Sequence, residues 1–388
     1  MQWINFLHFY QPANIDAFVI KEATERSYLR ILRALEKNKN VKFTANITGC
    51  LILRWEELGY NNVLKIIKKL IKRGQLELAG TAAYHPILPL IPKEEIIIQI
   101  RENEKIIKRL FGNIKMRGFF MPEMAYGAEA AKLIKALGYE YLILEEISYN
   151  GKLNRVDFNN VYRDKNSGLK IIFRSRTLSH SYVPEKIGKI IETKSRGREK
   201  IIITATDAEL YGLRHIDPSG KFEKLLKNKK IKTLTISEFI KNKKTVPALL
   251  VAANWESTEE EIKNKQPYSL WFNKKNEIQK KLWQLAYLAY AATEKFKNDD
   301  NFHWARWHLV RGLASCTFWW ASEKDFRYIF GPISWGPDMI ERGANELIRS
   351  IRSLDNPKTR PIKIKAEKLF TKIRQMIWEK HWKKHWKK

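Results

Sequence analysis

The sequence predicts an α/β protein in which parallel strands alternate with helices and close into a barrel, followed by a helical part. Seven short apolar runs recur up to about residue 205, and segments with helical spacing lie between several of them. After about residue 253 the apolar residues follow helical spacing only. Strands that alternate with helices indicate βαβ units and a parallel sheet, and such a series can close on itself.

The predicted strands are apolar runs of four to seven residues, rich in Ile, Phe, Leu or Tyr and too short for helices. They are Trp3–Leu7, Val41–Ile47, Leu76–Ala79, Gly118–Met121, Tyr141–Leu144, Lys170–Phe173 and Lys200–Thr204. A further run, Thr233–Ile236, is either an eighth strand or an edge element.

Helices are predicted both between these strands and after them. Apolar residues with helical spacing at 63–71 and 96–110 come shortly before Gly74 and Gly112, and a glycine just past the last turn is a usual helix stop. Four later stretches, 278–289, 305–313, 340–351 and 366–377, have the same spacing. We therefore predict a barrel over residues 1–253, an α-helical bundle domain over 254–378 and a basic tail over 379–388. No Gly/Ser/Pro linker separates the first two, so we expect them to pack together.

Composition narrows the class of protein. The chain has 388 residues, 44% of them hydrophobic, which is enough for one large catalytic domain and a second module. Its two cysteines, Cys50 and Cys316, lie far apart, which argues against a disulfide framework or a cysteine zinc site. The start of the chain lacks the pattern of a signal peptide, and no apolar run approaches the roughly 20 residues that span a bilayer. We expect a soluble, cytoplasmic protein without a membrane span.

The net charge of +30 raises the possibility of a nucleic-acid partner. The lysines are spread along the whole chain on predicted helix faces and turns, so a solvated surface is the better interpretation and no specific nucleic acid is expected. The tail at 379–388, a near-repeat of His, Trp and Lys, is interpreted as a frayed helix end rather than as a contact to an anionic surface.

Polar residues that handle protons or bind hydroxyl groups follow four of the predicted strands. His8 and Gln11 follow the first run, His85 the third, Glu123 the fourth and Asp207 the seventh. In a barrel of parallel strands the carboxyl ends open into the loops where chemistry collects. Sugar acetals are cleaved by a pair of carboxyl groups on one rim, so Glu123 and Asp207 are predicted to form such a pair.

These residues lie in the first four of five motifs, and with these motifs the chain resembles glycoside hydrolase family 57. In order, the motifs are His8-x-x-Gln11-Pro12; Gly74-Gln-Leu-Glu77 with the extension at His85; Met121-Pro-Glu123; Asp207-Ala-Glu-Leu-Tyr-Gly212; and Phe318-Trp319-Trp320. The resemblance covers essentially the whole chain except the tail. It implies a (β/α)7 barrel, an α-helical domain that completes the active cleft, and retention of the anomeric configuration.

The resemblance also implies roles for single residues. Glu123 matches the nucleophile and Asp207 the general acid/base, which a retaining enzyme holds about 5–5.5 Å apart. His8, Gln11, Glu77, His85 and Tyr211 match substrate-binding positions of the motifs. Glu209 is a rival for the acid role. No metal or cofactor is required by this mechanism.

Tryptophans and two further acids have separate interpretations. Trp255, Trp319 and Trp320 are candidate platforms for sugar rings, because indole faces pack against the apolar side of a pyranose. Trp304 and Trp307 lie at helical spacing and are interpreted as core or domain-interface residues. Glu145 and Glu146 close the fifth run and are expected to face the loop or a salt bridge.

The predicted function is a retaining enzyme acting on α-1,4-glucans, of the α-amylase or 4-α-glucanotransferase type. Ala208 and Leu213 depart from the family's fourth motif and touch the binding subsites rather than the catalytic pair. Two alternatives stay open: a glycan-binding protein that has lost catalysis, and a metal-dependent polysaccharide deacetylase. The second is disfavoured because His303 and His308 lie inside a predicted helix and not at a strand end.

Overall fold

The structure is a computed structural model of the protein, and it describes residues 1–193, 201–241, 243–324 and 334–385. The chain divides into two compact units. The first comprises residues 1–11, 15–83 and 88–267, and the second comprises residues 12–14, 84–87 and 268–388. The boundary in the chain thus falls after Pro267, and the division at residue 253 stays a prediction.

The first unit contains all seven predicted strands, although Lys200 of the seventh run lies outside the described residues. The run at Thr233–Ile236 gives only the short edge strand β9, which ends at Thr233. Two strands that the sequence did not predict, β6 and β10, are also present. The strands are β1 Gln2–Phe9, β2 Phe43–Ile47, β3 Leu76–Leu78, β4 Gly118–Phe119, β5 Tyr141–Glu145, β6 Val161–Asp164, β7 Lys170–Arg174, β8 Ile201–Asp207, β9 Lys232–Thr233 and β10 Thr245–Ala248.

These strands form two five-stranded sheets instead of one closed ladder. The first has the order β3-β2-β1-β8, with β9 paired to the start of β1, and all its pairs are parallel. The second has the order β10-β6-β7-β5-β4 and is parallel except between β6 and β7. The α/β class with parallel sheets is confirmed, whereas a single closed barrel ladder is not what the described strands form.

Isolated backbone contacts join the two sheets at both edges. Beyond the end of β3, Gly80 forms a parallel bridge with Phe119 of β4, and the amide of Gly80 donates to the carbonyl of Gly118 at 2.8 Å. On the other side, the amide of Ser175, just after β7, donates to the carbonyl of Ile203 in β8 at 2.9 Å. Because β3 and β4 have only three and two residues, no longer ladder forms between them.

Alternation along the strands separates two hydrophobic clusters, as expected for a sheet with two buried faces. Trp3, Leu7 and Phe9 of β1 belong to the cluster that contains the residues of α2 and α4. Ile4 and Phe6 belong to the other cluster, together with Ile203 of the adjacent strand β8 and with Ile143 and Ile172 of the second sheet. We call the second cluster the inner core, since it contains strand residues from both sheets.

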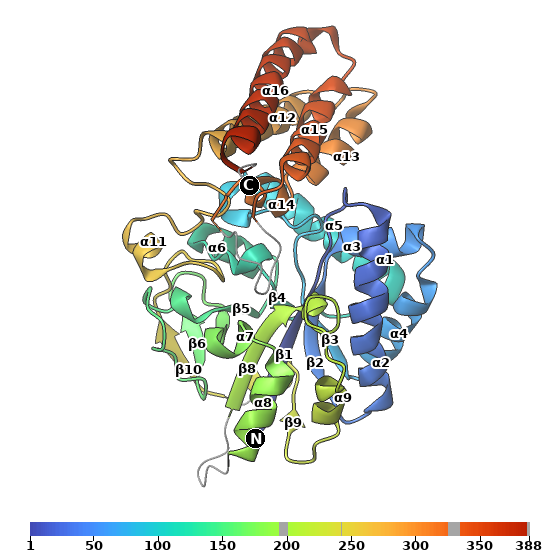
Figure 1. Ribbon diagram of the computed structural model, residues 1–388, viewed down its shortest axis with the longest axis vertical. Coiled ribbons are helices and arrows are strands. Elements are labelled where there is room, and N and C mark those ends of the chain that lie inside the picture. Colours follow the sequence, from blue (N-terminus) through green and yellow to red (C-terminus); the bar gives the residue numbers. More distant parts are fainter. Residues whose placement is uncertain (194–200, 242, 325–333, 386–388) are drawn as a thin grey trace. The chain divides into compact units, whose positions relative to one another are not determined.

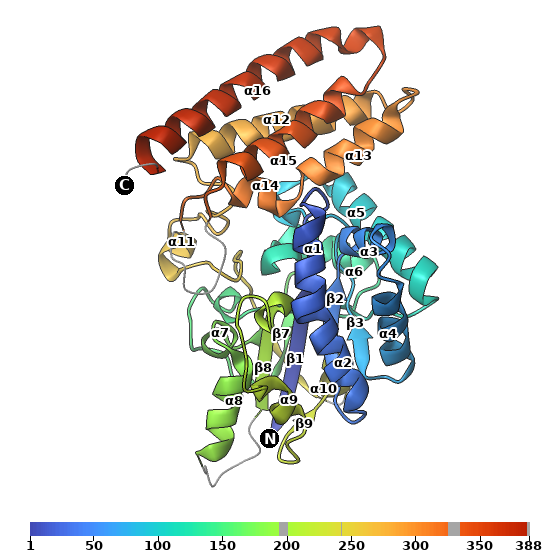
Figure 2. The ribbon, with the colours of Figure 1, turned by 45° about the vertical axis from the view of Figure 1, so that its right-hand side comes forward.

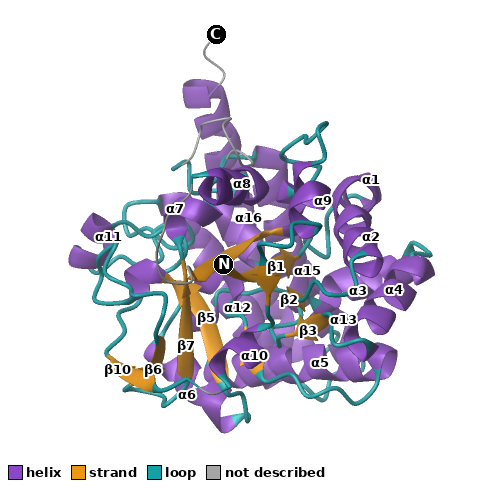
Figure 3. Cartoon of the chain, turned by 90° about the horizontal axis from the view of Figure 1, so that it is seen from below, coloured by secondary structure: helices purple, strands orange, loops and turns teal. Residues whose placement is uncertain are grey.

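Helices of the first unit lie outside the strands, as Figures 1 and 3 show for α2, α4, α5 and α8. In α4, for example, the buried residues Val63, Leu64, Ile67 and Leu70 follow helical spacing and form one apolar stripe that belongs to the core. The helices are α1 Ala17–Ala23, α2 Leu29–Lys37, α3 Gly49–Glu57, α4 Asn61–Lys72, α5 Lys93–Phe111, α6 Ala128–Ala136, α7 Arg176–Ser179, α8 Val183–Glu192, α9 Lys221–Leu226, α10 Ile236–Ile240 and α11 Glu259–Lys263.

The regular elements among the described residues of the second unit are helices, and four of them match the predicted stretches, with α14 in addition. α12, α15 and α16 contact one another and run side by side in Figures 1 and 2. The helices are α12 Glu277–Lys295, α13 Phe302–Gly312, α14 Ser315–Trp319, α15 Pro337–Arg352 and α16 Arg360–Lys380. Trp304 and Trp307 are 50% and 40% exposed, so they are not core residues, and their assignment to a domain interface stays a prediction. Of the predicted tail, residues 386–388 lie outside the described part, and His381–His385 continue the last helix as a π-helical turn.

Throughout the described ranges, each helix is too short or too polar to cross a lipid bilayer.

Candidate active site

His8 and Asp207 extend the inner face of two adjacent strands past the last apolar residue. On β1 the inner-core residues Ile4 and Phe6 are followed two positions later by His8, and on β8 Ala205 is followed by Asp207. His8 and Asp207 are directly opposite in the parallel register. Residues two apart share a face of a strand, so both side chains lie on the inner side at the carboxyl ends of their strands.

The His8 ring is held by the neighbouring strand and by an aromatic neighbour. Its Nδ1 lies 2.9 Å from Oδ1 of Asn46, near the carboxyl end of β2. The ring stacks on Phe120 with centroids 4.6 Å apart. Burial lowers the pKa of His8, although the charge of Asp207 and the Asn46 contact act in the opposite direction. The imidazole is therefore neutral near pH 7, and it presents a hydrogen-bonding group in a fixed orientation.

Asp207 is paired with an arginine that a second carboxyl group shares. The Arg214 guanidinium donates to Oδ2 of Asp207 at 2.7 Å, and its other amino group lies 3.7 Å from Oε2 of Glu209. A charge-assisted bond of this kind fixes the orientation of the carboxyl group. Asp207 thus has a defined orientation at the end of β8.

Glu209 is turned away from the strand and buried, at 3% exposure. After Asp207 the chain enters a 3₁₀ turn at Ala208–Leu210, and the Glu209 carboxylate accepts hydrogen bonds from the Tyr28 hydroxyl and, at 3.1 Å, from Nε2 of Gln11. Burial raises the pKa of Glu209 to about 7; the charge of Asp207 raises it too, and Arg214 opposes both. Gln11 is therefore bound to this second carboxyl group.

Glu123 sits on a strained turn after β4. In the 3₁₀ turn Pro122–Met124, Glu123 has φ 59° and ψ 17°, and Met124 has φ 49°. Non-glycine residues with positive φ are uncommon, and such strain of about 1–3 kcal/mol gathers at functional sites. The turn is bound to a distant loop: the amide of Trp255 donates to the carbonyl of Glu123 at 3.2 Å, and the amide of Tyr126 donates to the carbonyl of Ala253 at 2.8 Å.

Trp255 brings this turn next to His8. The indole is partly buried against the inner core, edge-on to the His8 ring at 6.0 Å and to Phe120 at 6.2 Å. His8 in turn is the register partner of Asp207. The structure therefore groups five of the predicted residues at the carboxyl ends of the strands: His8, Gln11, Glu123, Asp207 and Trp255.

Glu77 does not belong to this group. It lies in the middle of β3, and its two carboxylate oxygens accept hydrogen bonds from the hydroxyls of Thr44, Tyr141 and Ser237 and from the amide of Ser237. Tyr141 is the first residue of β5, and α10 with Ser237 follows β9, which pairs with the start of β1. The carboxylate thus ties strands together at their amino ends, opposite to His8 and Asp207.

Tyr211 is also placed away from a binding role. Its ring is 1% exposed and lies edge-on to Phe222 at 4.9 Å, in the cluster beneath the outer helices. Burial raises the pKa of Tyr211 to about 12. The side chain therefore packs α9 against the strand end.

The remaining three predicted residues lie in the second unit. His85 has φ 58°, and its Nδ1 is 3.0 Å from the Ser315 hydroxyl, while the Ser315 amide donates to the His85 carbonyl at 2.9 Å. Trp319 ends α14 and Trp320 follows it, with ring centroids 4.8 Å apart.

The structure adds residues that the sequence analysis did not single out. Asn46, Tyr28 and Arg214 contact His8, Glu209 and Asp207 directly. Asn46 had a usable signal, because it stands near the end of a predicted strand. Glu145 forms the salt bridge considered for it, with Arg174 and Arg176. Tyr28 is 181 positions from Glu209, and no local pattern connects them.

Comparisons with known proteins show which family the chain belongs to. The model of glycosyl hydrolase family 57 matches residues 5–252. The chain is 31% identical over 176 residues to an α-amylase of Pyrococcus horikoshii, which covers 44% of the chain and 27% of that protein. It is 27% identical over 259 residues to a 4-α-glucanotransferase of Thermococcus litoralis, covering 62% of the chain and 39% of that protein.

A solved structure supports the same fold. The crystal structure of a 4-α-glucanotransferase from Thermococcus litoralis superposes with a TM-score of 0.71 at 19% identity, covering 92% of this chain and 60% of that one. The chain spans only part of the two curated relatives: about a quarter of the α-amylase and about two fifths of the 4-α-glucanotransferase. Because the family model matches well over half of the residues, the chain belongs to glycosyl hydrolase family 57.

Proposed function

We propose that the protein cleaves α-1,4-glucans with retention of configuration, by way of a glycosyl-enzyme intermediate. The observation that carries the proposal is the grouping of Asp207, His8 and the strained Glu123 turn at the carboxyl ends of the inner strands. Two carboxyl groups on one rim are what a retaining mechanism needs, about 5–5.5 Å apart when a sugar is bound.

In this proposal Glu123 is the nucleophile and Asp207 the general acid/base. Glu123 attacks the anomeric carbon while Asp207 gives a proton to the leaving oxygen, and Asp207 then takes a proton from the acceptor. Arg214 orients Asp207. Glu209, whose pKa burial raises to about 7, holds a proton up to near-neutral pH, so the carboxyl group next to Asp207 is uncharged there.

The substrate class is supported by the relatives. Those reported above are named as an α-amylase and a 4-α-glucanotransferase, so a glucan or maltooligosaccharide is the proposed substrate. Either water or a sugar hydroxyl can take the glycosyl group from Glu123, which gives hydrolysis or transfer. His8, Gln11 and Trp255 are the proposed contacts to the sugar at the cleavage point.

The finer architecture is also a proposal. We propose that the two sheets are one (β/α)7 barrel made of β1, β2, β3, β4, β5, β7 and β8, supported by the contacts at Gly80 and Ser175 that join the sheets at both edges. This proposal keeps the predicted domain bounds of 1–253, 254–378 and 379–388. It also keeps the helical domain that completes the cleft, with His85, Trp319 and Trp320 as sugar contacts.

The test is to incubate the purified protein with maltoheptaose and to analyse the products by chromatography. Shorter products alone mean hydrolysis, and a ladder of longer and shorter chains means transfer. Glu123→Gln and Asp207→Asn each lower the turnover by at least about 100-fold, the usual contribution of a catalytic acid or nucleophile. Glu129→Gln is the matched control, because that side chain is 84% exposed on α6.

Two results would contradict the proposal. The first is a wild-type protein that leaves both maltoheptaose and amylose unchanged. The second is a Glu123→Gln variant that turns over maltoheptaose as fast as Glu129→Gln does.

A further inference from the structure

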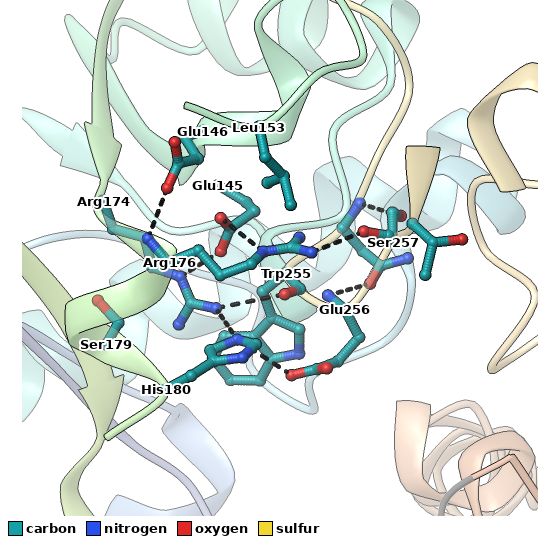
Figure 4. Close-up of polar contacts among 12 residues, drawn as sticks. Glu145, Glu146, Leu153, Arg174, Arg176, Ser179, His180, Trp255, Glu256 and Ser257 are labelled. Atoms are coloured by element: carbon teal, nitrogen blue, oxygen red, sulfur yellow. Dashed lines mark hydrogen bonds and ion pairs between the residues drawn. The ribbon is translucent and has the colours of Figure 1, made fainter. Parts of the chain in front are cut away.

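The Arg174 side chain is the centre of a buried polar network next to the candidate active site (Figure 4). Arg174 ends β7 and is 3% exposed. Its Nε donates to Glu145 at 2.5 Å, one amino group donates to the carbonyl of Ala205 at 2.8 Å, and the other lies 3.0 Å from Nε2 of His180. The second amino group also donates to the carbonyl of Trp255 at 3.3 Å, and the guanidinium stacks over the indole at 5.3 Å.

Two of these partners lead directly to the two proposed catalytic residues. Ala205 is two positions before Asp207 on the same face of β8. The amide of Trp255 donates to the carbonyl of Glu123, on the turn with positive φ. One guanidinium therefore joins the strand that carries Asp207 to the loop that holds Glu123.

We propose that Arg174 is a positioning residue that sets the relative placement of Glu123 and Asp207. This inference rests on the proposed function of those two residues. A planar guanidinium with five N–H donors serves Glu145, Ala205, His180 and Trp255 at once and also stacks on the indole, which a lysine ammonium on a flexible stem does not do. Retaining catalysis depends on the carboxyl separation, and a misplacement of about 1 Å can cost about 100-fold in rate.

Arg176 provides a matched control within the same network. It donates to the other oxygen of Glu145 at 3.0 Å and to the carbonyl of Ser257 at 2.9 Å. The contacts of its side chain thus include the same carboxylate and the same loop, two residues beyond Trp255. Neither of those contacts is to β8. A purely structural role of the Glu145 ion pairs would make the two arginines equivalent.

The experiment compares Arg174→Met, Arg174→Lys and Arg176→Met in the full chain. For Arg174→Met we expect kcat on maltoheptaose to fall by about 100-fold, because the relative placement of Glu123 and Asp207 is altered. KM rises by less than about tenfold, because the loop that carries the proposed sugar contact Trp255 is loosened as well. Arg174→Lys recovers less than about a tenth of the lost rate. Arg176→Met keeps kcat within about fivefold of the wild type, although its melting temperature falls as much as that of Arg174→Met.

Amide hydrogen exchange gives a readout that does not depend on activity. In Arg174→Met, exchange in residues 121–126 and 253–255 becomes at least about tenfold faster, because the loop loses its link to β8. In Arg176→Met those two segments keep the wild-type rate. This measurement separates the inference from the proposed function: an inactive wild type contradicts the function, whereas the exchange rates decide the coupling.

Three outcomes would overturn the inference. Exchange in both segments could be unchanged in Arg174→Met, Arg176→Met could lose as much kcat as Arg174→Met, or Arg174→Lys could regain full kcat. Each would mean that Arg174 contributes charge or stability without setting the geometry of the pair.

Discussion

The burial of Glu209 predicts a measurable pH dependence of stability, which Glu209→Gln should remove. Glu209 is 3% exposed, and the groups that face it are Tyr28, Gln11, Arg214 and Asp207. Glutamine has nearly the same shape and still accepts from Tyr28 and Gln11, but it does not ionise. The substitution therefore isolates the free energy of ionising this buried carboxyl group.

The sign follows from the direction of the pKa change. Burial raises the pKa of Glu209 from 4.5 to about 7, so between these pH values the folded chain binds more protons at this site than the unfolded chain. The stabilisation is fully present below pH 4.5 and is lost as the pH rises through 7. A pKa difference of about 2.5 corresponds to about 3 kcal/mol at 1.36 kcal/mol per pH unit.

The assay is urea unfolding of wild type and Glu209→Gln at several pH values between 4 and 8.5. The free energy of unfolding of the wild type minus that of the variant should fall by about 3 kcal/mol across this range. The same difference for Glu129→Gln, an 84% exposed side chain, should stay nearly constant. A Glu209 difference that is constant within about 1 kcal/mol, or that increases with pH, would refute the argument, because the buried carboxyl would then ionise as readily as an exposed one.

Two further predictions concern Glu77, which bonds strands at their amino ends, and Asn46, which contacts His8 in the candidate site. Glu77→Gln should lower the free energy of unfolding in urea by about 1–3 kcal/mol, because four donors lose a carboxylate acceptor. The kcat/KM of the folded protein should stay within about twofold of the wild type. A loss of activity without a loss of stability would mean that Glu77 belongs to the active site. Asn46→Ala should lower kcat/KM on maltoheptaose by about three- to tenfold, because one hydrogen bond that orients His8 is lost; unchanged kinetics would mean that packing on Phe120 alone orients the ring.

The strand positions could be predicted because most strands are short apolar runs with both faces buried. The two missed strands lack this signal. β10 contains Pro247, and its Val246 is 38% exposed, as expected for an edge strand. β6 has an exposed arginine at its third position and pairs antiparallel with β7. The closed barrel ladder was overpredicted because strand order alone says nothing about how long β3 and β4 are.

The placement of a candidate site residue could be predicted best where a polar residue stands at the end of an apolar run. His8 and Asp207 satisfy that condition, whereas Glu77 stands inside its run and is used to bond strands together. Glu209 shows a different limit. Two positions after Asp207 it would share a strand face with it, but the strand ends and a 3₁₀ turn directs Glu209 into the interior. Its partner Tyr28 comes from a distant helix-forming segment, and only the fold brings them together.

Three carboxyl groups near the candidate site differ in their surroundings, and these differences suggest how the site distributes charge. Asp207 is bonded to Arg214, Glu209 accepts hydrogen bonds from an uncharged phenol and an uncharged amide, and Glu123 is held through its backbone by Trp255. A single guanidinium faces both Asp207 and Glu209, and it lies 1 Å closer to Asp207. Burial and the neighbouring charge of Asp207 raise the pKa of Glu209 to about 7, so this buried acid keeps its proton up to near-neutral pH. Loss of that proton at higher pH places a negative charge next to Asp207, so Glu209 is the group through which pH acts on the proposed acid/base.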